Sequence, residues 1–348
     1  MPNPYDSKGP AHFWRSGVAI LSPRDVWPIP SRSFRIPSRA RIATAGSCFA
    51  QEVARVLVGL PEVEFMQTEQ SAPDQPLFSA RYGNIYTVRQ LRQLLFEAFS
   101  LIPRIDVAWR REDGRWVDAQ RPAMFAAGFD SAADVALART EHLASVRRLF
   151  SECSIFIFTL GLTEAWTSAS GDVVFPIAPG IVAEDVSGGS YTFHNFSYDE
   201  IIADLGDFIT EIRKINPAVR CILTVSPVPL VATYTDEHVL VATTHSKSIL
   251  RAVCSAAETR WEDVFYFPSY EIISSHFNNG AYYNDNKRTI AKSGVEHVMD
   301  VFQETYFGGK PGTPERVQEE PKSMLDEAFE SVDKVICDEE LITKSFGF

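Results

Sequence analysis

The stretch Arg41-Ile-Ala-Thr-Ala-Gly-Ser-Cys-Phe-Ala-Gln-Glu52 has the pattern of a strand, a tight turn and a helix. Its first half is apolar and β-branched, which favours a short buried strand. Gly46 permits a sharp turn, and Ser47 is a favoured residue for capping the start of a helix. From Phe49 to Leu57 the apolar residues take helical spacing. The stretch therefore predicts the opening unit of an α/β domain.

Ser47 and Cys48 put a hydroxyl and a thiol at this turn. The N-terminus of a helix presents free N–H groups and a partial positive charge. That field favours a thiolate or a developing oxyanion. The turn is therefore a candidate site for a nucleophile. The simpler interpretation is a capped helix with a small buried cysteine.

The composition is that of a soluble globular protein large enough for a sizeable core. Of the 348 residues, 45% are hydrophobic and 22% are charged. A net charge of -12 and a pI near 5.1 argue against a nucleic-acid or anionic-membrane partner, because both need a basic face. No apolar run approaches the roughly 20 residues of a membrane span.

The cysteines and the N-terminus suggest a reducing compartment. There are five cysteines, widely spaced and without a CxxC pair, which favours free thiols and gives no zinc pattern. The first residues, Met-Pro-Asn-Pro-Tyr-Asp, lack the features of a signal peptide. We therefore expect a cytoplasmic protein. Because no GxxxxGK[ST] or GxGxxG motif occurs, we expect no nucleotide cofactor. Because the cysteines give no zinc pattern, we also expect no metal.

The chain divides into three parts by composition. Residues 1–38 are rich in proline and predict an extended arm packed over the domain, because the prolines forbid a long helix. Residues 39–306 form the main domain, with an insertion around 103–135. Residues 307–348 predict an acidic, partly helical appendage, with its helix over 322–337.

Strand-like and helix-like segments alternate along the main domain. Apolar runs predict strands over 41–46, 154–160, 219–225 and 264–267. Helical periodicity predicts helices over 49–57, 88–99, 138–150, 198–215, 245–257 and 291–302, and residues 168–195 are expected to be loop. Continuous apolar strands favour a parallel sheet buried between helices. The predicted fold is thus a three-layer α/β/α domain with a mostly parallel sheet. Its catalytic loops are expected at the carboxyl ends of the strands.

Five stretches, taken in order, resemble one family. Gly46-Ser47-Cys48-Phe49-Ala50 resembles the signature that names the bacterial GSCFA-domain family, and residues 80–87, 159–166, 224–230 and 294–299 resemble further parts of it. The resemblance runs from about Ile42 to about Phe302. The family is grouped with the SGNH/GDSL hydrolases. The resemblance therefore implies a flavodoxin-like sheet and acyl-ester hydrolysis or O-acyl transfer on a small molecule or saccharide.

The wider hydrolase group implies roles for the first two blocks. Its first block reads Gly-Asp-Ser, which places Cys48 in the nucleophile position, whereas a shift by one residue makes Ser47 the nucleophile. Its second block supplies a glycine N–H to the oxyanion hole. Gly83 is the matching glycine, and Asn84 beside it offers a side-chain amide.

Later blocks depart from the group's pattern. The third reads Gly-x-Asn-Asp in the group and Gly161-Leu-Thr-Glu164 here, so the hydroxyl of Thr163 replaces the amide of the oxyanion donor. Glu164 is either a general acid/base or a structural acceptor. The last block should read Asp-x-x-His. Asp285 is present to orient a base or bind a hydroxyl, but Arg288 and Thr289 stand where the histidine is expected. Arg288 there binds an anionic group or is simply exposed.

The altered last block leaves the choice of a base open. A nucleophile needs a base within hydrogen-bond reach. Among the seven histidines we rank His297 first, then His245, then His276, although a single histidine on a helix is more often a packed or surface residue. Asp300 follows His297 at i+3 and could orient it. The alternative function is a non-catalytic protein that binds a ligand or partner on the same fold.

Overall fold

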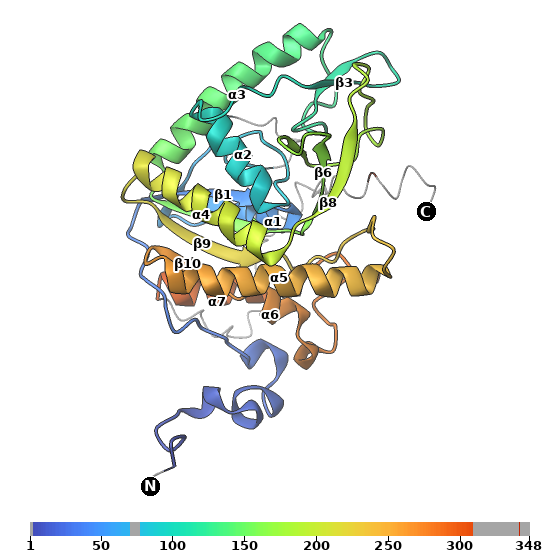
Figure 1. Ribbon diagram of the computed structural model, residues 1–348. Coiled ribbons are helices and arrows are strands. Elements are labelled where there is room, and N and C mark those ends of the chain that lie inside the picture. Colours follow the sequence, from blue (N-terminus) through green and yellow to red (C-terminus); the bar gives the residue numbers. More distant parts are fainter. Residues whose placement is uncertain (1–2, 70–76, 309–340, 342–348) are drawn as a thin grey trace, which may run out of the picture.

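The computed structural model describes residues 3–69, 77–308 and 341. At its centre lies a parallel sheet of five strands in the order β10-β9-β5-β1-β2 (Figure 1). The strands are β1 (Ala40–Gly46), β2 (Val63–Phe65), β5 (Ile155–Leu160), β9 (Arg220–Val225) and β10 (Val264–Tyr266). Numbered along the chain within this sheet, the order is 2-1-3-4-5, that of flavodoxin-like folds. The predicted α/β class and parallel sheet are confirmed.

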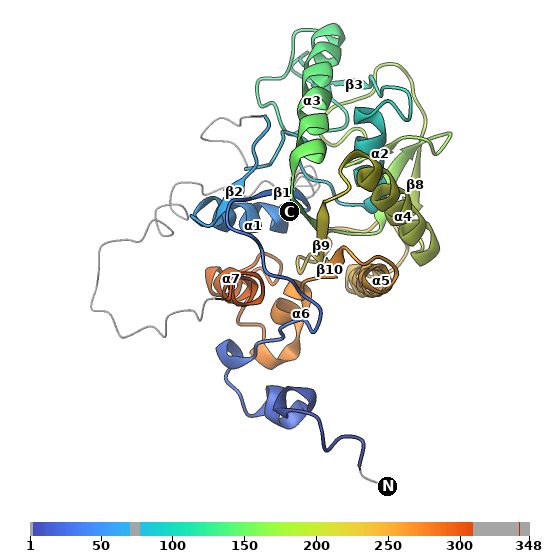
Figure 2. The same cartoon turned by 90° about the vertical axis from the view of Figure 1, so that its left-hand side faces the viewer.

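Helices cover both faces of this sheet. One face packs against α2 (Val88–Ala98), α3 (Ala132–Glu152), α4 (Tyr198–Ile215) and α5 (Val239–Arg260). The other packs against α1 (Cys48–Val58), α6 (Ser269–Ser274) and α7 (Lys292–Tyr306). In β5, Phe156 and Phe158 point to the first layer and Ile155 and Ile157 to the second, because side chains alternate along a strand. Figure 2 shows α1 and α7 on one side of the sheet and α2 and α4 on the other.

A second, antiparallel sheet follows β5. In it β6 (Glu164–Ser168) pairs with β7 (Val174–Phe175) and with β8 (Tyr191–Asn195). The expectation of loop over residues 168–195 is therefore wrong for these two strands. Their pairing with β6 gives them a regular structure that their glycine-rich local sequence does not indicate.

Residues 103–135, expected as an insertion, carry a short hairpin and the start of α3. The hairpin consists of β3 (Ala108–Arg110) and β4 (Trp116–Asp118). Its fully buried Trp109 packs on Phe175 of β7 with ring centroids 5.4 Å apart. The hairpin and the antiparallel sheet therefore share one small apolar core.

The observed ends of the helices agree better with their capping residues than with the ranges predicted from apolar periodicity. For α4 the predicted range is confirmed at both ends, and Ser197 and Glu200 form a capping box at its start. In contrast, α3 begins six residues before the predicted start, after the cap Ser131, and α5 begins at Val239 after the cap His238. The first turns of both helices are largely exposed, so they carry little apolar periodicity.

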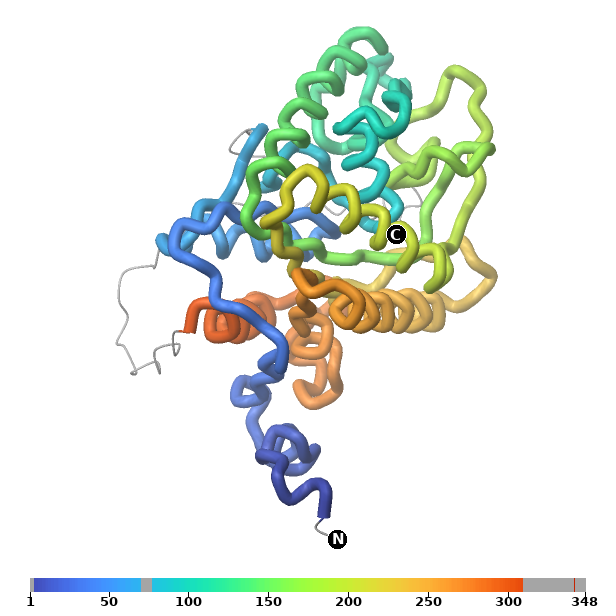
Figure 3. Tube along the Cα trace, turned by 60° about the vertical axis from the view of Figure 1, so that its left-hand side comes forward, coloured from blue at the N-terminus to red at the C-terminus, as the bar shows by residue number. Residues whose placement is uncertain are grey.

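The N-terminal residues lie over the α7 side of the domain. They form the short helical turns η1 (Pro10–His12), η2 (Arg15–Ala19) and η3 (Pro23–Asp25), and then an extended stretch (Figure 3). The backbone N–H of Ile36 donates to the Tyr306 carbonyl at 2.8 Å. The helix expected over 322–337 lies outside the described residues. Within the described ranges, no helix combines the length and the apolar character needed to span a membrane.

Candidate functional site

The turn after β1 lies at the topological switch point of the sheet. The chain leaves β1 for β2 on one side, and the later strands are added on the other side beginning with β5. In such sheets ligands bind outside the carboxyl strand ends at this point. Gly46 has φ +141° and pairs with Thr159, and an added Cβ would lie 2.4 Å from the Thr159 carbonyl oxygen. Only glycine fits there, so the turn is held directly against β5.

Three loops meet at this edge through backbone hydrogen bonds. The N–H of Ile85 donates to the Gly46 carbonyl at 2.8 Å. The Tyr86 carbonyl in turn accepts from the N–H groups of Gly161 at 2.9 Å and Leu162 at 3.2 Å. The loops after β1 and β5 therefore lie together at the carboxyl ends of the strands, with residues 85–86 between them.

A small cavity lies where these loops meet, and we call it the turn cavity. It offers about 10 Å³, which is room for roughly one water molecule. Its lining residues are Ser47, Cys48, Tyr86, Gly161, Leu162, Ser226, Val228, Pro229, Leu230 and Lys247. Ser47 is the N-cap of α1, yet its side chain makes no capping bond. Its hydroxyl oxygen is buried and has no hydrogen-bond partner among the described residues.

Lys247 lines the turn cavity and is not among the site residues predicted from the sequence. It lies on α5, is 2% exposed, and its Nζ donates to the Gly161 carbonyl at 2.5 Å. A lysine almost never lies this deep without a specific role or partner. The available signal was its position on the same helix face as the apolar Leu250 and Cys254.

The four described cysteines separate into two kinds. All four are buried, and none forms a disulfide within the described part of the chain. Burial raises the pKa of Cys153 to about 12 and also raises the pKa values of Cys221 and Cys254. Those three thiols belong to the core between the sheet and the helices of the first layer, where they act as small apolar side chains. Of the four, only Cys48 lines the turn cavity.

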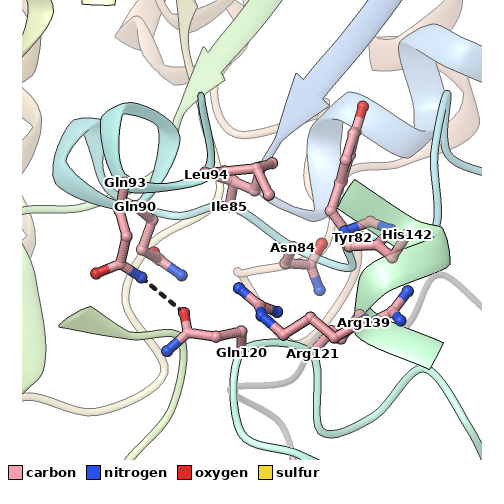
Figure 4. A pocket seen from close by; sticks show the side chains of 10 residues that line it. All are labelled: Tyr82, Asn84, Ile85, Gln90, Gln93, Leu94, Gln120, Arg121, Arg139 and His142. Carbon is pink, nitrogen blue, oxygen red and sulfur yellow. Dashed lines mark hydrogen bonds between the residues drawn. The ribbon is translucent and has the colours of Figure 1, made fainter. Parts of the chain in front are cut away.

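Asn84, predicted with Gly83 as an oxyanion donor, lines a different cavity. Gly83 has φ +72°, and a Cβ added to it would lie 3.3 Å from Met124. The Asn84 Oδ1 accepts from the Gln51 Nε2 at 3.0 Å. Figure 4 shows the Asn84 side chain beside Arg121 in a buried polar cavity on the α2 and α3 side. The structure therefore does not bring these two residues to the lining of the turn cavity.

Thr163 is fully buried just behind the turn cavity. Its hydroxyl donates to the Asn195 Oδ1 at 2.6 Å, and its N–H donates to the Ser246 Oγ at 3.0 Å. These bonds fasten the loop after β5 to β8 and α5. The Thr163 hydroxyl thus has a structural partner, whereas Gly161 lines the turn cavity itself.

None of the seven histidines, all within the described ranges, lines the turn cavity. His297 is fully buried on α7, where its Nδ1 lies 2.8 Å from the Tyr282 hydroxyl and burial lowers its pKa to about 4. His245 is exposed on α5, and His276 stacks on Trp14 of the N-terminal arm. On α5 it is Lys247, two residues after His245, that faces the site.

The residues from the last block lie around the rim. Asp285 is exposed. Arg288 is half-buried, and its Nε donates to the carbonyl of Pro229, a lining residue of the turn cavity, at 3.1 Å. Arg288 therefore brings a cation to the edge of the site without lining it.

Glu164 opens β6 and supports a neighbouring loop. Its Oε1 accepts from the Thr233 hydroxyl at 2.6 Å, and its Oε2 accepts from the Tyr234 N–H at 3.2 Å. This is the structural-acceptor arrangement that the sequence analysis weighed against an acid/base role. In the described part of the chain, no three metal-ligating side chains gather in a possible metal site.

These features define a class: a doubly wound α/β protein whose switch-point turn presents a hydroxyl and a thiol to a cavity with a buried lysine. Residues 41–302 match the model of the GSCFA family. The chain belongs to the GSCFA family, as its sequence blocks predict.

Comparisons with individual proteins add little to this assignment. No curated protein matches the chain. Two solved structures are similar over 76% of this chain and 94% of theirs, each with 13% identity and a TM-score of 0.27. One is a carbohydrate esterase family 3 from Talaromyces cellulolyticus, and the other is an acetyl esterase mutant with acetate ion. At these values neither similarity bears on the chemistry of this chain.

Proposed function

We propose that this protein is an acyl-ester hydrolase or O-acyltransferase acting on a small molecule or saccharide, with Ser47 or Cys48 as its nucleophile. One observation carries the proposal. Both side chains line a cavity at the switch point, at the N-terminus of α1, together with the buried Lys247.

The reaction needs two covalent steps at this turn. The nucleophile attacks the ester carbonyl, and the N–H groups of the first turn of α1 stabilise the oxyanion. Collapse of the tetrahedral intermediate expels the alcohol and leaves the acyl group on the Ser47 Oγ or the Cys48 Sγ. Water then releases the acid, or a second alcohol takes the acyl group. With Cys48 the intermediate is a thioester, which favours transfer.

Lys247 is the group best placed to manage the proton. With Ser47 as nucleophile, a neutral lysine takes the hydroxyl proton and returns it to the leaving alkoxide, as in Ser–Lys variants of the catalytic triad. With Cys48, a lysine ammonium stabilises the thiolate. The hydrogen bond from its Nζ to the Gly161 carbonyl holds the side chain at the site in either case.

The alternative is a protein on the same fold that binds a ligand without turning it over. Two observations favour it: no histidine lines the turn cavity, and this cavity has room for roughly one water molecule. Such a protein would hold its ligand at the strand ends without forming a covalent intermediate.

Turnover and covalent labelling decide between the two functions. We expect the full chain to hydrolyse p-nitrophenyl esters, and either Ser47→Ala or Cys48→Ala to lower kcat by about 10²–10⁴-fold. Ser248→Ala, at an exposed position of α5, is the matched control and should leave kcat unchanged. Retention of full turnover by both site variants would refute the proposal. Labelling of Ser47 or Cys48 by an acylating probe, located by mass spectrometry, would exclude the non-catalytic alternative.

A further inference from the structure

A much larger cavity lies beside the turn cavity, and we call it the apolar cavity. Its volume is about 350 Å³, within the range of small-molecule sites. Its lining is formed by Leu162, Glu164, Ala165, Trp166, Phe175, Pro176, Ile177, Ala178, Ile181, Phe193, Leu230, Ala232, Thr233 and Tyr234. These residues come from β6, β7 and β8, from the loops that follow β5 and β7, and from the loop that precedes α5. The antiparallel sheet, which the sequence did not predict, and the loop after β7 together supply nine of the fourteen lining residues.

The two cavities share part of their walls. Leu162 and Leu230 line both of them. Leu162 directly follows Gly161, whose carbonyl accepts the hydrogen bond from Lys247. The two cavities therefore adjoin, and a group attached to the nucleophile at the turn lies next to the apolar cavity.

The chemistry of the apolar cavity favours a hydrocarbon over a sugar. Trp166, Phe193 and Tyr234 form an aromatic wall, with ring centroids 4.8 to 6.0 Å apart. The one carboxylate, Glu164, already accepts hydrogen bonds from Thr233 and Tyr234. A saccharide here would leave most of its hydroxyls without partners, at a cost of about 1–3 kcal/mol for each buried group.

We infer that the apolar cavity binds the acyl group of the substrate, and that this group is a medium-length or aromatic acyl chain. The inference rests on the proposed function, because it places the scissile carbonyl at Ser47 or Cys48. The cavity's volume of about 350 Å³ lies at the small end of the range of small-molecule sites, about 300–1,000 Å³. That size suits a medium-length acyl chain or an arylacyl group better than an acetyl group.

Ligand binding and chain-length selectivity test this inference separately from catalysis. We expect decanoate to bind the full chain, measured by calorimetry, while acetate does not. Ala178→Trp, which fills the cavity, should weaken decanoate binding at least 10-fold. The control Ala169→Trp, at an exposed position outside the lining, should leave it unchanged. In ester assays, kcat/KM should be higher for decanoyl than for acetyl esters, and Ala178→Trp should abolish only that preference.

Tyr234→Ala provides a second variant that does not threaten the fold, because Tyr234 is 66% exposed. It should weaken decanoate binding several-fold. Decanoate binding without ester turnover would support the cavity and refute the proposed function. Turnover of acetyl esters without decanoate binding would leave the function standing and overturn the inference.

Leu341 packs on the neighbouring apolar core. Decanoate binding that appeared only after deletion of residues 342–348 would assign the cavity to the chain's own end and would also overturn the inference.

Discussion

Two buried polar regions of this domain differ in their hydrogen bonding: in one every side chain has a partner, and in the other a hydroxyl has none within the described part of the chain. In the first, which we call the paired cluster (Glu97, Asp118, Arg121, Arg139 and His142), every member has charged or hydrogen-bonded partners. The Arg139 guanidinium contacts both oxygens of Glu97 and also donates to Asp118 at 3.1 Å, and all three side chains are almost fully buried. The second region is the turn cavity, where the hydroxyl of Ser47 has no partner among the described residues.

The two regions show how a polar group that stabilises the fold differs from one that is available for chemistry. A buried polar group is costly unless it is paired, so a fully paired cluster fixes the orientation of α2 and α3 on the hairpin. An unpaired hydroxyl at the switch point contributes nothing to stability, which makes it a candidate for chemistry. If this comparison is correct, substitutions in the cluster change stability, and substitutions at the turn change activity.

The largest effect on stability should come from breaking the paired cluster. Arg139→Met leaves Glu97 and Asp118 without their shared cation, and we expect a loss of about 3–5 kcal/mol in the free energy of unfolding. Urea denaturation followed by circular dichroism measures this loss. Arg147→Met, at an exposed position of the same helix, should cost less than about 0.5 kcal/mol. Equal losses in both variants would contradict the structural role of the cluster.

The pH dependence of stability should also depend on this cluster. Burial, assisted by Arg121, lowers the pKa of His142 to about 4. Between its ordinary value of 6.5 and about 4, the unfolded chain therefore binds a proton that the folded chain does not. The stability falls as the pH falls through this window, by about 2 kcal/mol between pH 6.5 and 5. His142→Asn should flatten the dependence, and an unchanged slope in that variant would assign it to other groups.

Lys247 is intermediate between the paired cluster and the unpaired Ser47 hydroxyl, because it lines the turn cavity and yet has a defined hydrogen-bond acceptor. Lys247→Met removes the charge and leaves the Gly161 carbonyl without this donor, so we expect a stability loss of about 1–2 kcal/mol. Turnover should fall at least 10-fold, with a change in the pH–rate profile, because a proton-handling group is lost. A profile of unchanged shape would limit Lys247 to a positioning role.

The smallest change in stability is expected at Ser47. Ser47→Ala removes a hydroxyl that has no partner, so the free energy of unfolding should change by less than about 0.5 kcal/mol or rise slightly. Thr87→Ala is a useful comparison, because the Thr87 hydroxyl accepts from the Gln90 N–H and caps α2. Its loss should cost about 1 kcal/mol. A comparable loss at Ser47 would reveal a structural bond at the turn.

Much of the architecture is predictable from local pattern alone. The continuous apolar run Ile155–Leu160 indicates a strand buried on both faces, and Ser47 and Ser197 mark helix starts that the structure confirms. The turn at Gly46 is equally predictable, because only glycine is compatible with its backbone and with the close approach of Thr159. These features depend on residues that are neighbours in the chain or that share one periodicity.

The contents of the site depended on the tertiary structure. The turn cavity brings Lys247 to a carbonyl 86 residues earlier in the chain, whereas it leaves Gly83, Asn84 and His297 outside. The side on which a helical residue lies follows from how that helix packs, and one step along α5 separates an exposed side chain from a buried one. By itself, the sequence determined the parallel α/β sheet and the turn at Gly46 with its hydroxyl and thiol, because both follow from local spacing and backbone geometry. Only the packing of distant segments decided which groups surround that turn, since long-range contacts have no local signature.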